Sequence, residues 1–116
     1  MAALFDVYGR ILFNYTPKEG EEDTLANALT VAALRRVKLP MLDVRNQVLD
    51  NLNLSELIAP YADFSNATIH RVDFSNALLE GAFFTDASIE DVVARGATID
   101  EAGLRGAKTL VNIIRN

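Results

Sequence analysis

Residues 62–81 read ADFSN-ATIHR-VDFSN-ALLEG, four groups of five residues that follow one pattern. A small apolar residue opens each group, and a large apolar residue stands two places later. The small positions continue through Ala62, Ala67, Val72, Ala77, Ala82, Ala87, Val92, Ala97, Ala102 and Ala107. The positions two places later are Phe64, Ile69, Phe74, Leu79, Phe84, Ile89, Ala94, Ile99, Leu104 and Thr109, of which eight of ten are large and apolar. The chain is therefore a repeat with a period of five.

This period excludes a single helix and a flat strand. A helix turns by about 100° per residue, so successive fifth residues would be rotated by about 140° and would scatter around the axis. A strand alternates its faces with period 2, so an odd repeat would send each alanine to the opposite face. Each repeat must therefore turn a corner, with the small and the large residue both facing inward.

The expected corner position lies two residues after the large one. It is occupied by Asn66, Asn76, Gly81, Asp86, Asp91, Gly96 and Gly106, with Arg71 and Glu101 as departures. Glycine, asparagine and aspartate tolerate the left-handed and turn conformations that a corner requires. Turn residues at a constant short period are typical of a solenoid.

The motif resembles the pentapeptide-repeat family, most plainly at residues 62–66 (ADFSN) and 72–76 (VDFSN). The resemblance implies an all-β solenoid, a right-handed quadrilateral β-helix with four repeats per coil. Residues 20 apart should then stack, and Phe64 with Phe84 and Pro40 with Pro60 fit that spacing. A degenerate frame extends upstream, so we expect residues 37–109 to form a β-helix of about four coils.

The two ends of the solenoid need covering, because they expose unpaired strand groups. Residues 1–36 are expected to form an N-terminal β-hairpin around Gly9 and then a capping α-helix that begins after Asp23 or Thr24 and runs to about Arg36. This arrangement resembles bacterial and bacteriophage pentapeptide proteins. Residues 110–116 are expected to be an apolar C-terminal cap or dimerisation segment, and all three segments belong to one structural domain.

The C-terminal segment leaves two alternatives open. The apolar residues Leu110, Val111, Ile113 and Ile114 follow the point where the repeat loses its large inward residue. Burying one such side chain fully is worth roughly 1.5 to 3 kcal/mol. We therefore expect either a homodimer through this segment or a tail that folds back over the last coil of a monomer.

Composition argues against catalysis. The 116 residues include one histidine and no cysteine, so the common nucleophilic triads and transition-metal clusters lack their parts. His70 is expected to be a solvent-exposed structural residue, and the adjacent acids Glu90-Asp91 and Asp100-Glu101 to be solvated corners. We expect no enzyme activity, no cofactor and no metal. The absence of a signal-like or membrane-spanning apolar run predicts a cytoplasmic protein that does not bind membranes.

Function is then expected on the outer faces, as a non-enzymatic protein-interaction scaffold whose partner the sequence does not name. Candidate partner-binding residues are Met41, Ile58, Tyr61, Leu78 and Phe83, which stand at outward or corner positions. An apolar patch on a small domain indicates a partner surface. The alternative is that the N-terminal helix or hairpin packs over it.

The family resemblance implies a second function. Similar proteins that protect DNA gyrase from quinolones are acidic rods that mimic duplex DNA. For this chain we expect no direct nucleic-acid binding. The candidate acids are Asp63, Asp73, Asp86, Glu90, Asp91, Asp100 and Glu101. The net charge of −5 has the right sign, but duplex DNA carries one charge per about 1.7 Å and thus about eleven over a rod of roughly 18 Å. A third alternative is a structural, oligomeric component.

Overall fold

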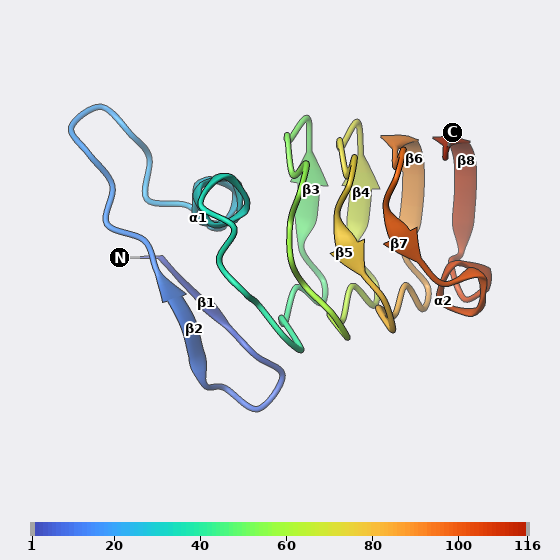
Figure 1. Cartoon of the computed structure of the whole chain (residues 1–116), viewed down its shortest axis with the longest axis horizontal. Helices are drawn as coiled ribbons and strands as arrows, with labels where there is room; N and C mark the ends of the chain where they lie inside the picture. Colours follow the sequence, from blue (N-terminus) through green and yellow to red (C-terminus); the bar gives the residue numbers. More distant parts are fainter. Residues whose placement is uncertain (1, 116) are drawn as a thin grey trace.

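The computed structural model describes residues 2–115 and shows a β-solenoid with a hairpin and a helix at its N-terminal end (Figure 1). Met1 and Asn116, which belong to the expected terminal segments, lie outside the described residues. The elements in chain order are β1 (Ala3–Phe5), β2 (Ile11–Asn14), α1 (Leu25–Leu34), β3 (Val48–Asp50), β4 (Thr68–His70), β5 (Leu78–Leu79), β6 (Ser88–Val93), β7 (Thr98–Ile99), α2 (Glu101–Arg105) and β8 (Thr109–Ile114).

The coils stack with a repeat of 20 residues. In the parallel sheet β3-β4-β6-β8, Leu49 pairs with Ile69 and Ile69 pairs with Ile89. In the parallel sheet β5-β7, Leu79 pairs with Ile99. Isolated bridges between residues 20 apart join the remaining sides of the coils. Four five-residue repeats therefore make one coil, as the family resemblance implies.

The corners follow the predicted period. Eleven non-glycine residues and two glycines have positive φ at every fifth position from Arg36 to Gly96. Most corners close with a hydrogen bond across four residues, as where the Ala62 N–H donates to the Ala59 carbonyl at 3.3 Å. Pro60 is the second residue of that turn and Tyr61 the third, which is the type II pattern with proline before a residue of positive φ. Pro40 and Pro60 therefore lie where no backbone N–H is needed.

The regular frame is shorter than expected. It spans 60 residues, from position 36 to position 96, and makes three turns of 20 residues in place of nearly four. The expectation of about four coils is wrong because the chain leaves the frame at α2. Residues 101 and 106 are not left-handed corners, since Glu101 begins α2 and Gly106 has a φ of −75°.

The interior is a column of stacked apolar side chains. Phe64, Phe74 and Phe84 are fully buried. The rings of Phe64 and Phe84 stack with their centroids 5.0 Å apart, and Phe74 meets Phe64 edge-on at 6.0 Å. The alanines at the small positions from Ala62 to Ala87 are buried as well, which lets opposite sides of each coil approach closely, whereas Ala102 is exposed on α2.

The N-terminal elements cover the first coil. The Thr24 side chain caps α1 by accepting a hydrogen bond from the Asn27 N–H at 3.2 Å, and the helix buries Ala28, Leu29, Ala32 and Ala33. The helix ends at Leu34, two residues before the predicted end. The hairpin β1-β2 joins the solenoid through an antiparallel bridge between Asp6 and Leu42.

A buried carboxylate closes the hairpin turn. Asp6 accepts hydrogen bonds from the Tyr8 and Arg10 backbone N–H groups at 2.9 Å and an ion pair from the Arg10 guanidinium at 2.8 Å. Burial alone would raise the pKa of Asp6, but the hydrogen bonds from Arg10 and Tyr8 and the guanidinium charge outweigh it and lower the pKa. The ionised form of Asp6 is therefore part of the folded hairpin.

Helix α2 replaces one repeat at the C-terminal end and shifts the register by one residue. Glu101 in its first turn and Arg105 in its last turn complement the helix dipole. Strand β8 then pairs with β6 at a separation of 21, so that Leu110 lies beside Ile89. Leu110, and not Thr109, thus takes the position that a large inward residue would occupy.

Candidate functional site

Three exposed apolar side chains gather at one corner of the solenoid. Tyr61, Leu78 and Phe83 are 57%, 41% and 53% exposed, and we call them the corner patch. Tyr61 stands at the corner one coil before Gly81, while Leu78 and Phe83 flank that corner on the next coil. Their chain neighbours Leu79 and Phe84 are buried, because inward and outward positions alternate. The repeat itself therefore holds the corner patch outward.

The other two candidate partner-binding residues are partly covered. The Met41 carbonyl accepts a hydrogen bond from the Val7 N–H at 2.9 Å, and Met41 is half-buried beside the hairpin. Ile58 is also half-buried, and it bridges Lys38 on one side and Leu78 on the other. The hairpin thus covers the Met41 end of the predicted surface and leaves the corner patch uncovered.

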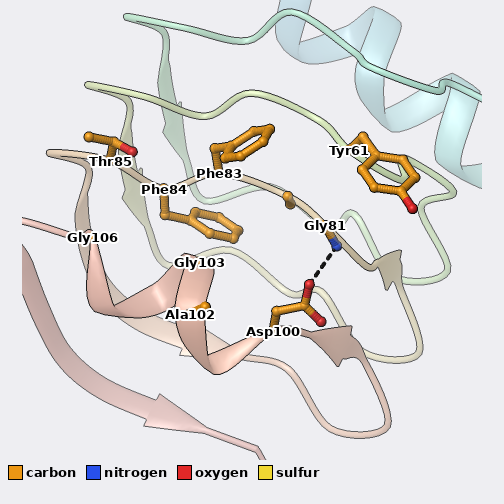
Figure 2. Close-up of a pocket in the computed structure, with 10 residues that line it drawn as sticks. Tyr61, Gly81, Phe83, Phe84, Thr85, Asp100, Ala102, Gly103 and Gly106 are labelled. Carbon is orange, nitrogen blue, oxygen red and sulfur yellow. Dashed lines mark hydrogen bonds between the residues drawn. The ribbon is translucent and has the colours of Figure 1, made fainter.

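A groove of about 320 Å³ adjoins the corner patch (Figure 2). It lies between residues 81–85 and α2, and its ten lining residues are Tyr61, residues 81–85, and Asp100, Ala102, Gly103 and Gly106. Asp100 joins the two sides, because its Oδ2 accepts a hydrogen bond from the Gly81 N–H at 2.8 Å. The groove is therefore apolar, with one carboxylate at its edge.

Two glycines shape the groove walls. A Cβ at Gly81 would come within 2.3 Å of Cδ1 of the Tyr61 ring, so the ring lies directly over the glycine backbone. A Cβ at Gly103 would come within 2.4 Å of the Ala82 carbonyl oxygen, so α2 sits against the coil. Side chains at either position would push the walls apart.

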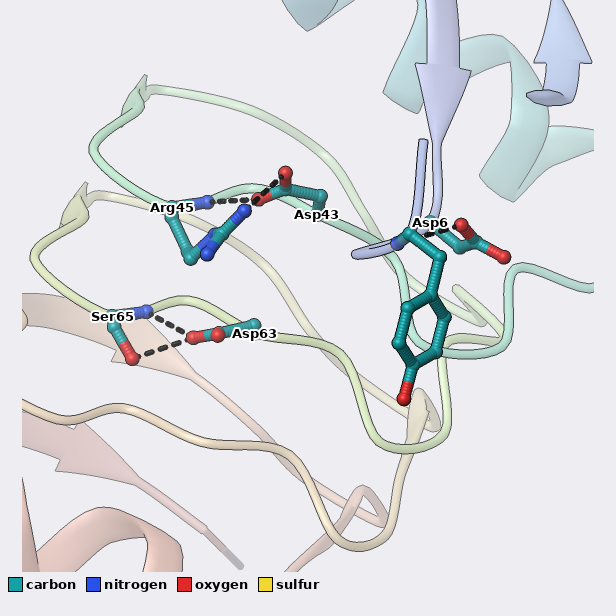
Figure 3. Close-up of polar contacts among 6 residues, drawn as sticks. Asp6, Asp43, Arg45, Asp63 and Ser65 are labelled. Atoms are coloured by element: carbon teal, nitrogen blue, oxygen red, sulfur yellow. Dashed lines mark hydrogen bonds and ion pairs between the residues drawn. The ribbon is translucent and has the colours of Figure 1, made fainter. Parts of the chain in front are cut away.

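The candidate acids Asp63 and Asp73 have local partners and lie on different sides of the coil. Asp63 accepts hydrogen bonds from the Ser65 N–H at 2.9 Å and hydroxyl at 2.5 Å, and Asp73 accepts one from the Ser75 N–H at 2.8 Å (Figure 3 shows the first pair). Asp63 and Asp73 are half a coil apart, so they stand on opposite faces. Both carboxylates therefore serve turns of the backbone.

The remaining candidate acids lie toward the C-terminal half. Asp86 and Asp91 are exposed corners, and Asp91 accepts a hydrogen bond from the Asn112 side chain at 2.7 Å. Glu90 Oε2 lies 3.6 Å from His70 Nε2, and Glu101 pairs with Arg115. Together with Asp100 at the groove, they form no continuous row of charge.

Asp43 lies beside Asp63 on the preceding coil, and its carboxylate also has a partner within its own turn. The Arg45 guanidinium donates two hydrogen bonds to this carboxylate, from Nε to Oδ1 at 2.9 Å and from Nη2 to Oδ2 at 2.9 Å (Figure 3). The hydrogen bond from the Arg45 side chain lowers the pKa of Asp43 and outweighs its partial burial. The charge of this acid is therefore matched within the same turn.

His70 is partly exposed, with Nε2 3.3 Å from the Ser88 hydroxyl. Within residues 2–115, no group of three or more histidine or acidic side chains is placed to hold a metal ion. None of the described helices is both long and apolar enough to span a membrane.

The C-terminal apolar residues lie on β8, the last strand of the four-stranded sheet. Leu110, Val111 and Ile114 are 48%, 51% and 37% exposed, while Ile113 is half-buried against Val92. In the described part of the chain, β8 has a strand partner on one side only. This end of the solenoid therefore presents apolar side chains beside an open strand edge.

Comparison with known proteins agrees with the coil geometry. A search of curated proteins gave no match. Residues 61–108 match the family model described as pentapeptide repeats, in nine copies. That segment coincides with the part of the solenoid that carries the corner patch and the groove. The five-residue corners, the 20-residue coil and this match together identify residues 61–108 as a segment of pentapeptide repeats.

Proposed function

We propose that this protein is a non-enzymatic scaffold that binds another protein through the corner patch of Tyr61, Leu78 and Phe83. The observation that carries the proposal is the exposure of these three large side chains around one corner of the solenoid. Single exposed apolar residues are normal on protein surfaces, whereas adjoining ones mark interaction sites. The cytoplasmic location expected from the sequence stays part of this proposal.

The rigidity of the backbone around the corner patch supports the proposal, in addition to the exposure of the side chains. The backbone around the patch is held by coil-to-coil hydrogen bonds, such as Tyr61 N–H to the Glu80 carbonyl at 2.8 Å and Phe83 N–H to the Ala62 carbonyl at 2.9 Å. A partner would therefore not need to order this backbone on binding. Tyrosine and phenylalanine also supply large contact areas, and aromatic residues are enriched at the centres of interfaces.

The gyrase-directed function implied by the family resemblance stays a prediction. Mimicry of duplex DNA requires charge along a continuous surface, since DNA carries one charge per about 1.7 Å. Asp63 and Asp73 stand on opposite faces, and the charge of Glu101 is matched by the Arg115 guanidinium. This distribution favours the corner patch as the binding surface.

The proposal is tested by affinity capture from a lysate of the source cells. The patch variant combines Tyr61→Asn with Phe83→Ser, since asparagine tolerates the positive φ of 59° at position 61. The control variant combines Val48→Ser with Ile11→Ser, which removes exposed apolar side chains elsewhere. We expect the wild type and the control to capture the same proteins and the patch variant to lose them. Retention by the patch variant, or equal loss from both variants, would contradict the proposal.

A further inference from the structure

The groove beside α2 has a composition that indicates one kind of occupant. Nine of its ten lining residues are uncharged, and Asp100 is the only charged one. The nearby acid Glu101 is paired with Arg115, so its charge is matched outside the groove. We infer that this groove receives an arginine side chain of the partner protein, an inference that rests on the proposed function.

Asp100 supplies the anionic end of such a site. Its Oδ2 accepts the Gly81 N–H at 2.8 Å, which fixes the carboxylate at the groove edge. Its other oxygen, Oδ1, has no hydrogen-bond partner in residues 2–115. A guanidinium can donate to this oxygen in a charge-assisted hydrogen bond, which is roughly twice as strong as a neutral one.

The aromatic side of the groove also suits a guanidinium group. Figure 2 shows the rings of Tyr61 and Phe83 across the groove from α2, with Asp100 at its edge. A cation placed over an exposed aromatic face gains about 0.5–1 kcal/mol. A planar guanidinium can also stack on a ring while it donates to a carboxylate, which an ammonium group cannot do.

The floor and the size of the groove fit an arginine stem. Backbone and small side chains at Ala82 and Gly103 form an apolar surface against which three methylene groups can pack. The groove volume of about 320 Å³ lies at the lower end of the range of about 300–1,000 Å³ for small-molecule sites. It therefore has room for one side chain rather than for a large ligand.

Other occupants fit less well. An anionic ligand would be repelled by Asp100, and no basic residue lines the groove to offset that charge. A wholly apolar side chain would cover the carboxylate without satisfying Oδ1, and an unsatisfied charged group is costly. The excess of acidic residues in the chain, with a net charge of −5, also favours a basic partner segment.

The test is an NMR titration of the ¹⁵N-labelled protein with N-acetyl-L-arginine N-methylamide. The citrulline analogue has nearly the same shape without the charge and serves as the matched probe. We expect saturable shifts of the Gly81 and Gly103 amide signals, with those of Gly9 and Gly20 unchanged. We expect the citrulline probe to bind at least about tenfold more weakly.

Two variants locate the charge that matters. Asp100→Asn keeps an oxygen acceptor for the Gly81 N–H and removes the negative charge, so it should weaken arginine binding at least about tenfold. Asp91→Asn removes the same charge at an exposed corner with φ of 54° and should leave binding unchanged. Folding of both variants is checked from the remaining amide signals.

Equal binding of the two probes, equal weakening by the two variants, or the absence of a saturable shift would overturn the inference. The proposed function is judged separately by the capture experiment. If the patch variant loses its partners while arginine fails to bind, only the groove inference is wrong. If arginine binds and the patch variant keeps its partners, the groove exists and the proposed function is wrong.

Discussion

Replacing Phe84 by alanine tests the register of the coil, with Phe83→Ala as the matched control. Both changes remove the same atoms at adjacent positions of one coil. Phe84 is 2% exposed and stacks on Phe64 at 5.0 Å, whereas Phe83 is 53% exposed. The frame therefore predicts very different losses of stability from two chemically identical substitutions.

The expected loss for Phe84→Ala is about 3–5 kcal/mol, as for other buried aromatic side chains. The expected loss for Phe83→Ala is below about 1 kcal/mol, since surface substitutions usually change stability little. A typical domain has about 5–15 kcal/mol in total, so the Phe84 variant should remain foldable but marginal. Urea unfolding followed by circular dichroism gives both free energies of unfolding. Equal losses would refute the register, because a shift of one residue exchanges the inward and outward faces.

Four further predictions concern a corner, the hairpin, the C-terminal edge and gyrase. At the corner residue Asn66, with φ of 60°, replacement by alanine should cost about 1–2 kcal/mol in urea unfolding and replacement by glycine nearly nothing; equal stabilities would contradict the corner assignment. Because the folded pKa of Asp6 is lowered, its contribution to stability should be present at neutral pH and lost as pH falls through that lowered pKa. Asp6→Asn should remove that part of the dependence of the free energy of unfolding on pH. An unchanged dependence in this variant would contradict the role given to Asp6. We propose a homodimer through β8, so light scattering should show twice the chain mass for the wild type and the chain mass for Leu110→Glu with Val111→Glu; a monomeric wild type would exclude it. In a gyrase supercoiling assay we expect little inhibition, and strong inhibition that fades with added salt and with neutralisation of the candidate acids would reverse our preference.

The sequence predicts the coil well because each repeat carries its own structural signal. Corner residues such as Asn66, Asn76 and Gly81 tolerate positive φ, and the inward positions must be apolar to fill a narrow interior. The 20-residue stacking follows from four corners per turn. Even Arg71, which lacks a turn preference, has φ of 53°, since its neighbours in the frame impose the corner.

Helix α2 could not be predicted from the same signal. Ala102, Leu104 and Ala107 keep the small-and-large spacing, so the five-residue frame continues in the sequence while the backbone leaves it. A helix of five residues is too short to show a period of its own. Glu101, at an expected corner, and Thr109, polar where a large apolar residue is expected, are the two departures near the change of register.

The candidate site was predictable to the extent that it depends on the coil. Tyr61, Leu78 and Phe83 are exposed because the frame turns them outward. Met41 is covered because the hairpin docks beside it, and that tertiary contact has no repeat pattern in the sequence from which it could be predicted. The five-residue pattern does not predict the groove, because it does not predict α2. Gly103 and Asp100 form the groove only once that helix packs on the coil.

The central claim is that the protein acts through its corner patch, and site-specific photo-cross-linking tests it most directly. A photoreactive phenylalanine analogue is placed at position 83 and, as a control, at Val48, which is 69% exposed on β3. After irradiation in the source cells, we predict a discrete cross-linked protein with the analogue at position 83 and none with it at position 48. The same cross-linked protein from both positions, or none from position 83, would contradict the claim.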